Sequence, residues 1–254
     1  MNKKEREIPD YGNWFPKRLI YLSLIICVLF LMFLPVSVLF IIPALLFLSF
    51  AMFIIYGRYM LSNPQRNLQD RFWELVLTNL DWNGEGQILD IGCGNGGLTV
   101  KTAKKHKNSK VTGIDYWGKK WEYSKNLCDR NAAIEGVAER TTFQKASAAS
   151  LPFDDEYFDA AVSNFVFHEV GYTKNKREVI REALRVVKKG GYFSFQDEFL
   201  IKQLYGTPDE LVDTIKSWGI SKVEFVETRG EDFIPKTLKL PFIFGSVGLI
   251  KGKK

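Results

Sequence analysis

The residues best suited to chemistry in this chain form a glycine-rich run from Asp90 to Gly97, which reads D-I-G-C-G-N-G-G. An apolar stretch typical of a buried strand precedes it, and a stretch with helical spacing follows. Glycine lets the main chain turn tightly and lets a ligand approach the backbone closely. The run therefore predicts a loop that binds a nucleoside cofactor.

The glycine spacing alone fits two kinds of cofactor. Gly92, Gly94 and Gly97 satisfy the dinucleotide pattern G-x-G-x-x-G, whereas Gly92, Gly94 and Gly96 satisfy the G-x-G-x-G pattern of S-adenosylmethionine sites. Asp90, at the end of the preceding strand, suits a cationic ligand group such as the amino group of S-adenosylmethionine and would repel a pyrophosphate. An acid that ends the next predicted strand, Asp115, can bind both ribose hydroxyls. Because both cofactors use such an acid, it indicates a nucleoside without saying which.

A third stretch, residues 147–164, reads S-A-A-S-L-P-F-D-D-E-Y-F-D-A-A-V-S-N. With the loop and Asp115, it resembles the class I S-adenosylmethionine-dependent methyltransferases, especially the branch of ubiquinone/menaquinone-type C-methyltransferases. In that family D-x-G-C-G-x-G is followed by an acid, by D-A-x-x-L-P-F-x-D-x-x-F-D and by R-x-L-K-P-G-G. The last motif reads L-R-V-V-K-K-G-G here, with Lys189 in place of proline. The resemblance covers residues 87–195 strongly and the following residues loosely, and it does not cover residues 1–64.

The resemblance implies a set of cofactor contacts. Its members are Asp90, Gly92, Cys93, Gly94, Gly96, Asp115, Tyr116, Ser147, Ala148 and Asn164. Gly92, Cys93 and Gly94 would line the methionine part, and Asp90 would bind its amino group directly or through water. Asp115 would hold the ribose, and Tyr116 would lie along the adenine.

Ser147 departs from the family pattern, because many relatives carry an aspartate there that accepts a hydrogen bond from the adenine amino group. A serine can accept the same bond with one oxygen but without charge, or the backbone of Ala148 can take over the contact. After the next predicted strand, Asn164 would face the sulfonium side of the cofactor. The sequence therefore predicts a weaker adenine contact than the family pattern provides.

The candidates for catalysis are His168 and Glu169, which follow the strand predicted at residues 157–163. Either could act as a general base or contact the acceptor, or the pair could cap the next helix. Asp197 and Glu198 follow the next strand and also point to the ligand-binding edge, although solvated loop acids are the simpler interpretation. Methyl transfer from a sulfonium is an in-line displacement that depends mainly on holding donor and acceptor together. A base is needed only if the acceptor must lose a proton.

The overall composition excludes several other kinds of site. The three cysteines and two histidines have no metal-ligand spacing, so no metal site is predicted, and a reducing compartment fits best. The net charge of +6 is modest and gathers at the chain ends and beside the apolar stretch. A membrane surface explains this distribution better than nucleic acid, since no stripe of Lys or Arg with interleaved aromatics is present.

Residues 19–56 contain no Asp, Glu, Lys or Arg. A single straight helix of this length would extend about 57 Å at 1.5 Å per residue, whereas the hydrocarbon core of a bilayer is about 30 Å thick. Two transmembrane helices that turn near residues 35–37 fit better, with Pro43 inside the second helix. A single tilted span is the alternative.

Positive charges flank this stretch on both sides. They are Lys3, Lys4, Arg6, Lys17 and Arg18 before it, and Arg58, Arg66 and Arg71 after it. By the positive-inside rule, both flanks are expected in the cytoplasm. The sequence therefore predicts a two-pass membrane protein with its catalytic domain and both termini on the cytoplasmic side.

Strand and helix patterns alternate after the apolar stretch. Strands are predicted at residues 87–91, 110–114, 141–145, 157–163, 192–196, 222–228 and 242–251, and helices at 65–80, 97–105, 119–133, 174–187 and 208–218. This order predicts an α/β domain with a doubly wound, mostly parallel seven-stranded sheet, a Rossmann-like methyltransferase fold, preceded by the two transmembrane helices. The expected divisions are residues 1–18, a cytoplasmic segment; 19–56, the hairpin; 57–82, a linker with an amphipathic helix; and 83–254, the methyltransferase domain.

These patterns together predict a membrane-anchored methyltransferase that uses S-adenosylmethionine and acts on a small or lipid-soluble acceptor. The segment before the first strand often covers the active site in this fold, and here it emerges directly from the predicted membrane segment. An anchored S-adenosylmethionine-binding module without catalysis is the first alternative, and an NAD-type oxidoreductase is the second. No pattern in the sequence indicates the acceptor atom or an oligomeric state.

Overall fold

The computed structural model describes residues 7–62, 67–118, 122–171, 173, 175–220, 222–241 and 243–254. The chain forms two compact units. Met1–Gly12 and Asp70–Lys254 make up the first, and Asn13–Gln69 make up the second. The N-terminal segment therefore belongs to the same unit as the α/β domain, although the second unit separates the two along the chain.

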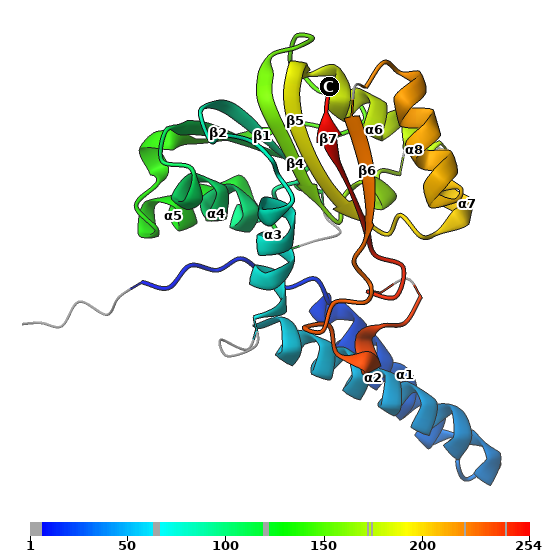
Figure 1. The fold of residues 1–254 in the computed structure, drawn as a ribbon. Helices are drawn as coiled ribbons and strands as arrows, with labels where there is room; N and C mark the ends of the chain where they lie inside the picture. Colours follow the sequence, from blue (N-terminus) through cyan, green and yellow to red (C-terminus); the bar gives the residue numbers. More distant parts are fainter. Residues whose placement is uncertain are drawn as a thin grey trace, which may run out of the picture. The chain divides into compact units, whose positions relative to one another are not determined.

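The first unit is built on a seven-stranded sheet in the order β3-β2-β1-β4-β5-β7-β6 (Figure 1). Its strands are β1 (Gly86–Ile91), β2 (Ser109–Asp115), β3 (Thr141–Lys145), β4 (Phe158–Asn164), β5 (Val187–Asp197), β6 (Lys222–Glu227) and β7 (Gly248–Lys253). Strands β1 to β5 pair in parallel, and β7 runs antiparallel to both β5 and β6. The predicted mostly parallel sheet with a final antiparallel pair is confirmed.

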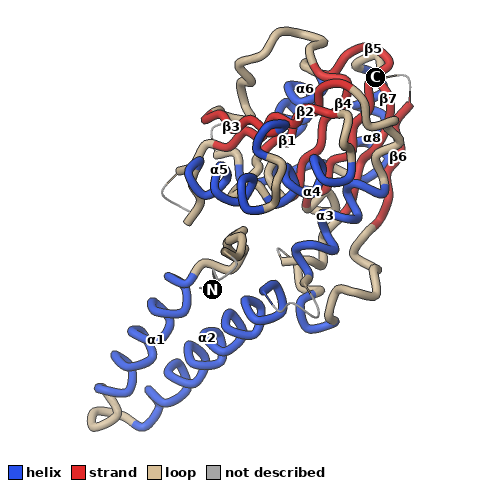
Figure 2. The backbone as a smooth tube through the Cα atoms, turned by 90° about the vertical axis from the view of Figure 1, so that its left-hand side faces the viewer, coloured by secondary structure: helices blue, strands red, loops and turns tan. Residues whose placement is uncertain are grey.

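Helices lie on both faces of this sheet (Figures 1 and 2). They are α3 (Leu68–Thr78), α4 (Gly97–Lys105), α5 (Lys125–Ile134), α6 (Lys176–Arg185), α7 (Lys202–Tyr205) and α8 (Pro208–Ser217), and short 3-10 turns occur at Ala138–Arg140, Phe167–Glu169 and Lys236–Leu238. On one face, the Ser194 hydroxyl of β5 donates to the Val76 carbonyl of α3 (2.8 Å). On the other, the side chains of α6 and α8 join the main apolar core with β1, β4 and β5. Alternate residues of each strand therefore face different helix layers.

Several element boundaries differ from those expected. Strand β5 begins at Val187 rather than at residue 192, and α6 ends at Arg185 rather than at residue 187. Helix α5 begins at Lys125 rather than at residue 119, because the Ser124 hydroxyl caps its first turn by accepting from the Leu127 amide (3.3 Å). Residues 119–121 lie outside the described residues. Strand β7 begins at Gly248 rather than at residue 242, because the chain still turns at Gly245, whose amide donates to the Leu240 carbonyl (2.9 Å).

The second unit is a helical hairpin of α1 (Lys17–Met32) and α2 (Ile41–Ser62), with the 3-10 turn Val38–Phe40 before α2. The two helices pack side by side along their length (Figure 2). At the open end, the Asn13 carboxamide donates to the Arg58 carbonyl (3.0 Å) and to the Ser62 hydroxyl (2.8 Å). The place where the chain enters the hairpin therefore lies beside the place where it leaves.

Only part of the predicted membrane segment has the length of a transmembrane helix. Among the described residues, one helix, Val38–Ser62, is long and apolar enough to cross a bilayer. Helix α1 has 16 residues and is therefore about 24 Å long, short of the roughly 30 Å of a hydrocarbon core. The expectation of two transmembrane helices is not supported, because α1 begins only after Pro16 and ends at the turn that follows Met32.

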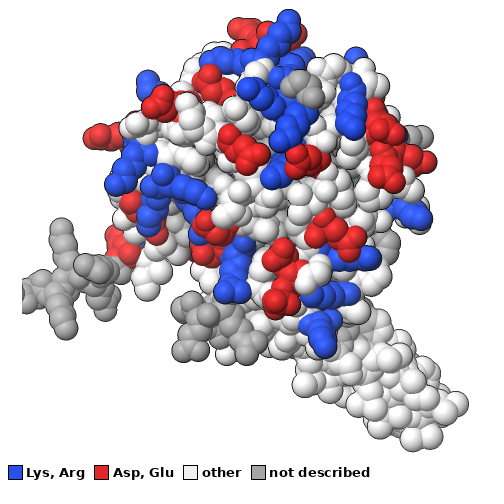
Figure 3. Space-filling model, in the orientation of Figure 1, with Lys and Arg blue, Asp and Glu red and all other residues white. Residues whose placement is uncertain are grey.

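The surface of the hairpin is nevertheless apolar over most of its length. Figure 3 shows no Lys, Arg, Asp or Glu on the visible face of the region formed by α1 and α2 beyond its open end. Large apolar side chains such as Leu22, Val28, Leu46 and Met52 are more than half exposed. A contiguous apolar surface of this kind indicates contact with a membrane or with another protein.

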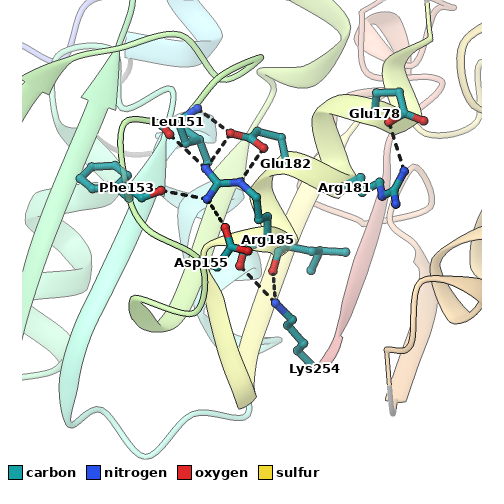
Figure 4. A network of polar contacts seen from close by, with 9 residues as sticks. Leu151, Phe153, Asp155, Glu178, Arg181, Glu182, Arg185 and Lys254 are labelled. Atoms are coloured by element: carbon teal, nitrogen blue, oxygen red, sulfur yellow. Dashed lines mark hydrogen bonds and ion pairs between the residues drawn. The ribbon is translucent and has the colours of Figure 1, made fainter.

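The Leu-Pro-Phe stretch that follows β3 is held by α6 through one guanidinium (Figure 4). Arg185 donates to the carbonyls of Leu151 (3.0 Å) and Phe153 (2.9 Å) and to the carboxylate of Asp155 (2.6 Å). Glu182 accepts from the same guanidinium (2.9 Å) and from the Leu151 amide (2.7 Å). Helix α6 therefore fixes the loop that leads into β4.

We expect Arg185→Leu to lower the free energy of unfolding by about 2 kcal/mol, because two loop carbonyls and two carboxylates lose their donor. The unfolding midpoint should then fall by roughly 4 to 8 °C in a thermal melt. Arg181→Leu is the matched control, since the partner of Arg181 within the described part of the chain is the exposed Glu178 at 3.9 Å (Figure 4). Equal melts for the two variants would contradict this account.

Candidate functional site

The glycine run forms the loop between β1 and α4 at the carboxyl edge of the sheet. Gly92, Gly94 and Gly96 all have positive φ angles, of 75°, 57° and 83°. At Gly92 a Cβ atom would lie 2.2 Å from the Val166 side chain, so no larger residue fits there. The amides of Gly92 and Cys93 both donate to the Ile114 carbonyl (2.8 Å), which fastens the loop to the end of β2.

Asp115 ends β2 and holds the loop from the other side. Its carboxylate accepts from the amides of Gly94 (3.0 Å) and Trp117 (2.7 Å), and the Trp117 indole donates to the Gly94 carbonyl (2.8 Å). Burial raises the pKa of Asp115, while these amide bonds oppose the rise. Each carboxylate oxygen keeps a further lone pair, so the residue fits the expected role of holding two ribose hydroxyls.

Asp90 lies beneath the loop. It is 1% exposed and accepts a hydrogen bond from the Thr99 hydroxyl of α4 (2.6 Å). Burial raises its pKa to about 7, against the hydrogen bond from Thr99, and the charge of Asp115 adds to the rise. The structure therefore places this carboxyl between β1 and α4, and its contact with the cofactor amino group stays a prediction.

A contact between Asp90 and the cofactor amino group would make cofactor binding release a proton. An ammonium group close to Asp90 favours the carboxylate and lowers its pKa. Because the free carboxyl is mostly protonated below its pKa of about 7, we expect release of up to one proton near pH 6 and almost none near pH 8.5. Calorimetry in buffers of different ionisation enthalpy measures this number. Asp90→Asn should abolish the release, Asp154→Asn on the exposed turn should preserve it, and proton uptake would contradict the expected contact.

The predicted adenine contacts lie at the ends of β2 and β3. Tyr116 is 55% exposed, with the Lys145 ammonium 5.5 Å from the centre of its ring. The Ser147 hydroxyl accepts from the Ala149 amide (3.2 Å), and Ala148 is buried. The parallel register of β2 and β3 pairs Asp115 with Lys145, so these residues lie on the same side as the ribose contact.

Asn164 is the last residue of β4, and Gln196 is the last but one of the neighbouring strand β5. The Gln196 carboxamide donates to the side-chain oxygen Oδ1 of Asn164 (2.9 Å). Because β1 also pairs in parallel with β4, Asn164 belongs to the same carboxyl edge as Cys93 and Gly92. The predicted cofactor residues therefore come together along one edge of the sheet.

His168 lies beside a second carboxyl at this edge. Its Nδ1 is 2.6 Å from the carboxylate of Asp197, and its Nε2 is 3.6 Å from that of Glu169. Asp197 is fully buried and also accepts from the amides of Phe167 and Glu198 (both 2.6 Å). The interpretation of Asp197 as a solvated loop acid is therefore wrong, since its lone pairs are used to fix the His168 loop.

The charges around this pair set its protonation. Burial lowers the pKa of His168, but the carboxylate of Asp197, with Glu198 and Glu169, raises it overall to about 9. Burial also raises the pKa of Glu198 to about 7, against the charge of His168. The ring is therefore held by its Nδ1, with Nε2 3.6 Å from the Glu169 carboxylate, and a pKa of about 9 keeps it protonated at neutral pH. The role of His168 as a general base stays a prediction.

A cavity of about 450 Å³ lies at the opposite edge of the sheet. Asp81, Asp159, Lys188 and Tyr192 are among its lining residues, near the amino ends of β1, β4 and β5. Parallel α/β sheets bind their ligands at the carboxyl ends of the strands. This cavity is therefore separate from the candidate site.

The chain is similar to known methyltransferases over the part that carries this site. Residues 89–195 match the protein family described as methyltransferase domain. The chain is 30% identical over 139 residues to the ubiquinone/menaquinone biosynthesis C-methyltransferase UbiE of Desulfotalea psychrophila, a match that covers 54% of this chain and 52% of that protein. It is 29% identical over 136 residues to the phthiotriol/phenolphthiotriol dimycocerosates methyltransferase of Mycobacterium tuberculosis, which covers 54% and 46%. The chain thus spans about half the length of these relatives.

Solved structures share the fold at low sequence identity. A SAM-dependent methyltransferase from Aquifex aeolicus aligns with a TM-score of 0.53 and 19% identity, over 76% of this chain and 94% of that one. The geranyl diphosphate C-methyltransferase of Streptomyces coelicolor A3(2), solved with Mg²⁺, geranyl diphosphate and S-adenosyl-L-homocysteine, aligns with a TM-score of 0.55 and 14% identity, over 77% and 86%. At these identities the likeness concerns the fold alone.

Proposed function

We propose that this chain, whose residues 89–195 form an S-adenosylmethionine-dependent methyltransferase domain, transfers the methyl group of that cofactor to a small or lipid-soluble acceptor at a membrane surface. The observation that carries the acceptor class is the exposed apolar surface of the hairpin together with its short connection to the domain. Helix α2 ends at Ser62 and α3 begins at Leu68. The intervening residues reach at most about 20 Å, so a hairpin in the bilayer keeps the domain near its surface.

The names of relatives support a lipid-soluble acceptor. One is named for ubiquinone and menaquinone biosynthesis, another for phthiotriol dimycocerosates, and a third, from Caenorhabditis elegans and 31% identical over 122 residues, is a sterol 4-C-methyltransferase. These names describe the acceptors of the relatives. For this chain, we propose a quinone, a sterol or another apolar molecule as the first class of acceptor to test.

The residues of the site divide the work between binding and proton transfer. Bound S-adenosylmethionine supplies an activated methyl group on a sulfonium. Asp115 and the glycine loop hold the nucleoside, so that the acceptor meets the methyl group in line. His168 takes the proton that an acceptor hydroxyl, amine or activated carbon gives up, and Asp197 keeps the ring oriented for that transfer.

The same proposal places both chain ends and the domain on the cytoplasmic side. It is supported by the hydrogen bonds that join Asn13 to Arg58 and Ser62, which bring the two ends of the hairpin together, and by the positive charges in both flanks. We expect protease added to sealed inverted vesicles to digest the domain, and protease added to right-side-out vesicles to leave it intact. The reverse pattern would contradict the orientation.

The activity itself can be tested with membranes that contain the full chain. Incubated with S-adenosylmethionine labelled in the methyl group, they should transfer label to a species in the lipid extract. Label found only in protein or nucleic acid would exclude the proposed acceptor class. Binding of S-adenosylhomocysteine without any transfer would instead favour a binding module without catalysis, and binding of NAD would favour an oxidoreductase.

A further inference from the structure

The N-terminal residues 7–12, here called the strap, are fixed onto the methyltransferase domain. The Asp10 backbone amide donates to the side-chain oxygen Oδ1 of Asn131 (2.9 Å), and the side-chain Nδ2 of Asn131 donates back to the Asp10 carbonyl (2.8 Å). The Tyr11 ring meets Trp73 edge to face at 5.4 Å. These contacts join residues more than 60 positions apart, so the strap is part of the folded domain rather than a loose tail.

Asn131 also joins the strap to the cofactor loop. It lies on α5, is fully buried, and its amide group donates to the Asn95 carbonyl (2.9 Å) as well as to Asp10. Gly12 has a φ of 71°, and a Cβ there would lie 2.7 Å from the Tyr123 ring and 3.3 Å from the Asn95 Nδ2. The Tyr123 ring is also the nearest neighbour to a Cβ placed on Gly94. The strap and the loop are therefore in contact.

Asn95 has one amide group without a partner. The residue is 2% exposed, and its side-chain oxygen Oδ1 accepts from the Ser124 amide (3.0 Å), which fixes the orientation of the carboxamide. Its Nδ2 has no hydrogen-bond partner among the described residues. Buried amide donors are nearly always paired in native proteins, and this one lies in the glycine loop, which makes it a candidate for contact with a ligand there.

The methionine part of S-adenosylmethionine carries a carboxylate that needs such a donor. Asn95 stands two residues before the start of α4, where the free amides of the first turn also favour an anion. Two lysines of the same helix are engaged elsewhere, Lys101 with Asp70 (2.7 Å) and Lys104 with Glu135 (2.5 Å). Because these two ammonium groups are already paired, we expect the neutral amide of Asn95 to bind the methionine carboxylate.

We propose that the Asn95 amide donates to the methionine carboxylate of the cofactor, and that the strap closes the loop over this end of the ligand, with Asn131 as the positioning residue. This inference rests on the cofactor use in the proposed function. In this inference the strap, which precedes the hairpin in the chain, and the glycine loop together bind the methionine part of the cofactor. Loss of the strap should then weaken binding of the methionine part and spare the nucleoside part.

The test compares two ligands on the full chain in detergent. S-adenosylhomocysteine carries the amino acid part, whereas methylthioadenosine has the same nucleoside without it. Asn95→Asp keeps the oxygen that accepts from Ser124 and replaces the donor with an acceptor. We expect calorimetry to show S-adenosylhomocysteine bound at least about tenfold more weakly, because a hydrogen bond to a charged group is lost and a repulsion is added, and methylthioadenosine bound within about twofold.

A second variant acts on the strap alone. Gly12→Ala places a Cβ against Tyr123 at a backbone angle that alanine disfavours, so it should displace the strap and give the same selective loss. Hydrogen exchange should show residues 7–12 protected when S-adenosylhomocysteine binds the parent chain, and unprotected in Gly12→Ala. Glu7→Gln is the control, because the contact of Glu7 among the described residues is an exposed ion pair with Arg130 at 3.5 Å.

The outcomes are distinct. Equal losses for both ligands, or no loss for either, would overturn the assignment of Asn95 and the strap. Failure of the parent chain to bind either ligand would instead contradict the cofactor use on which the inference rests. Thermal melts of each variant, compared with the parent, show whether the domain is folded under the conditions of the binding experiment.

Discussion

Replacing His168 with alanine is expected to lower kcat by about 10²- to 10⁴-fold while the affinity for S-adenosylhomocysteine stays within about twofold. The reason is that His168, held at 2.6 Å from Asp197, is the proposed base for the acceptor, whereas the glycine loop is the proposed cofactor site. Single-turnover rates with an acceptor identified in the lipid extract measure the effect. An unchanged rate would mean that the acceptor transfers no proton to this residue.

The pH dependence provides an independent check on the same residue. A general base must be unprotonated, and Asp197 and its neighbours raise the pKa of His168 to about 9 against the effect of burial. The rate should therefore rise with pH and level off above about pH 9. Asp197→Asn removes the charge that most favours the protonated ring, so the rise should move towards the ordinary histidine pKa of about 6.5. A pH profile that does not move would exclude His168 as the titrating base.

His106 provides a matched control, since it is the other histidine of the chain. It follows α4, at the opposite end of that helix from the glycine loop, and its ring lies 5.1 Å from that of Trp82. His106→Ala is expected to lower stability through lost packing and to leave kcat unchanged. A loss of kcat in both variants would indicate a general effect on folding.

The second large effect is expected on cofactor binding. Asp115→Ala should weaken the binding of S-adenosylhomocysteine by about 10²-fold or more, because two ribose hydroxyls lose a charged acceptor. The loop also loses the partner of the Gly94 and Trp117 amides. Calorimetry measures the affinity, and methylthioadenosine should lose as much as S-adenosylhomocysteine, because both ligands carry the ribose.

Asp154→Ala is the control for this change, since Asp154 lies on an exposed turn after Phe153. It should leave both affinities unchanged. If Asp115→Ala weakened S-adenosylhomocysteine but spared methylthioadenosine, the carboxylate would act on the amino acid part, and its assignment to the ribose would be wrong.

The order of strands and helices could be predicted because local patterns carry it. Strand β3 at Thr141–Lys145 and helix α4 at Gly97–Lys105 have the predicted bounds. Each is delimited by its own polar or glycine-rich neighbours. The start of β7 could not be predicted in the same way, because residues 243–247 keep the apolar composition of a strand although the chain turns there.

Side-chain partners were beyond the reach of the sequence. The motifs located Asp90, Asp115 and His168 at the edge of the sheet, but the Asp197 carboxylate that meets His168 stands 29 positions away. The bond between Asp10 and Asn131 spans 121 positions. Such pairs depend on how the strands and helices pack against one another, and the local spacing of apolar and polar residues does not determine that packing. The role of Asn95 likewise depends on a buried amide whose lack of a partner is visible only in the folded chain.

The contact between the strap and α5 limits how the hairpin can meet a bilayer. A chain in which residues 10 and 131 share hydrogen bonds can cross a membrane between them only an even number of times. A lone tilted span is incompatible with that bond, whatever the lengths of the helices. Since α2 is the long apolar helix, any crossing by α2 requires α1 to return through the same bilayer. A 16-residue helix can do this only where the membrane thins or where the basic residues at its start, Lys17 and Arg18, reach outward.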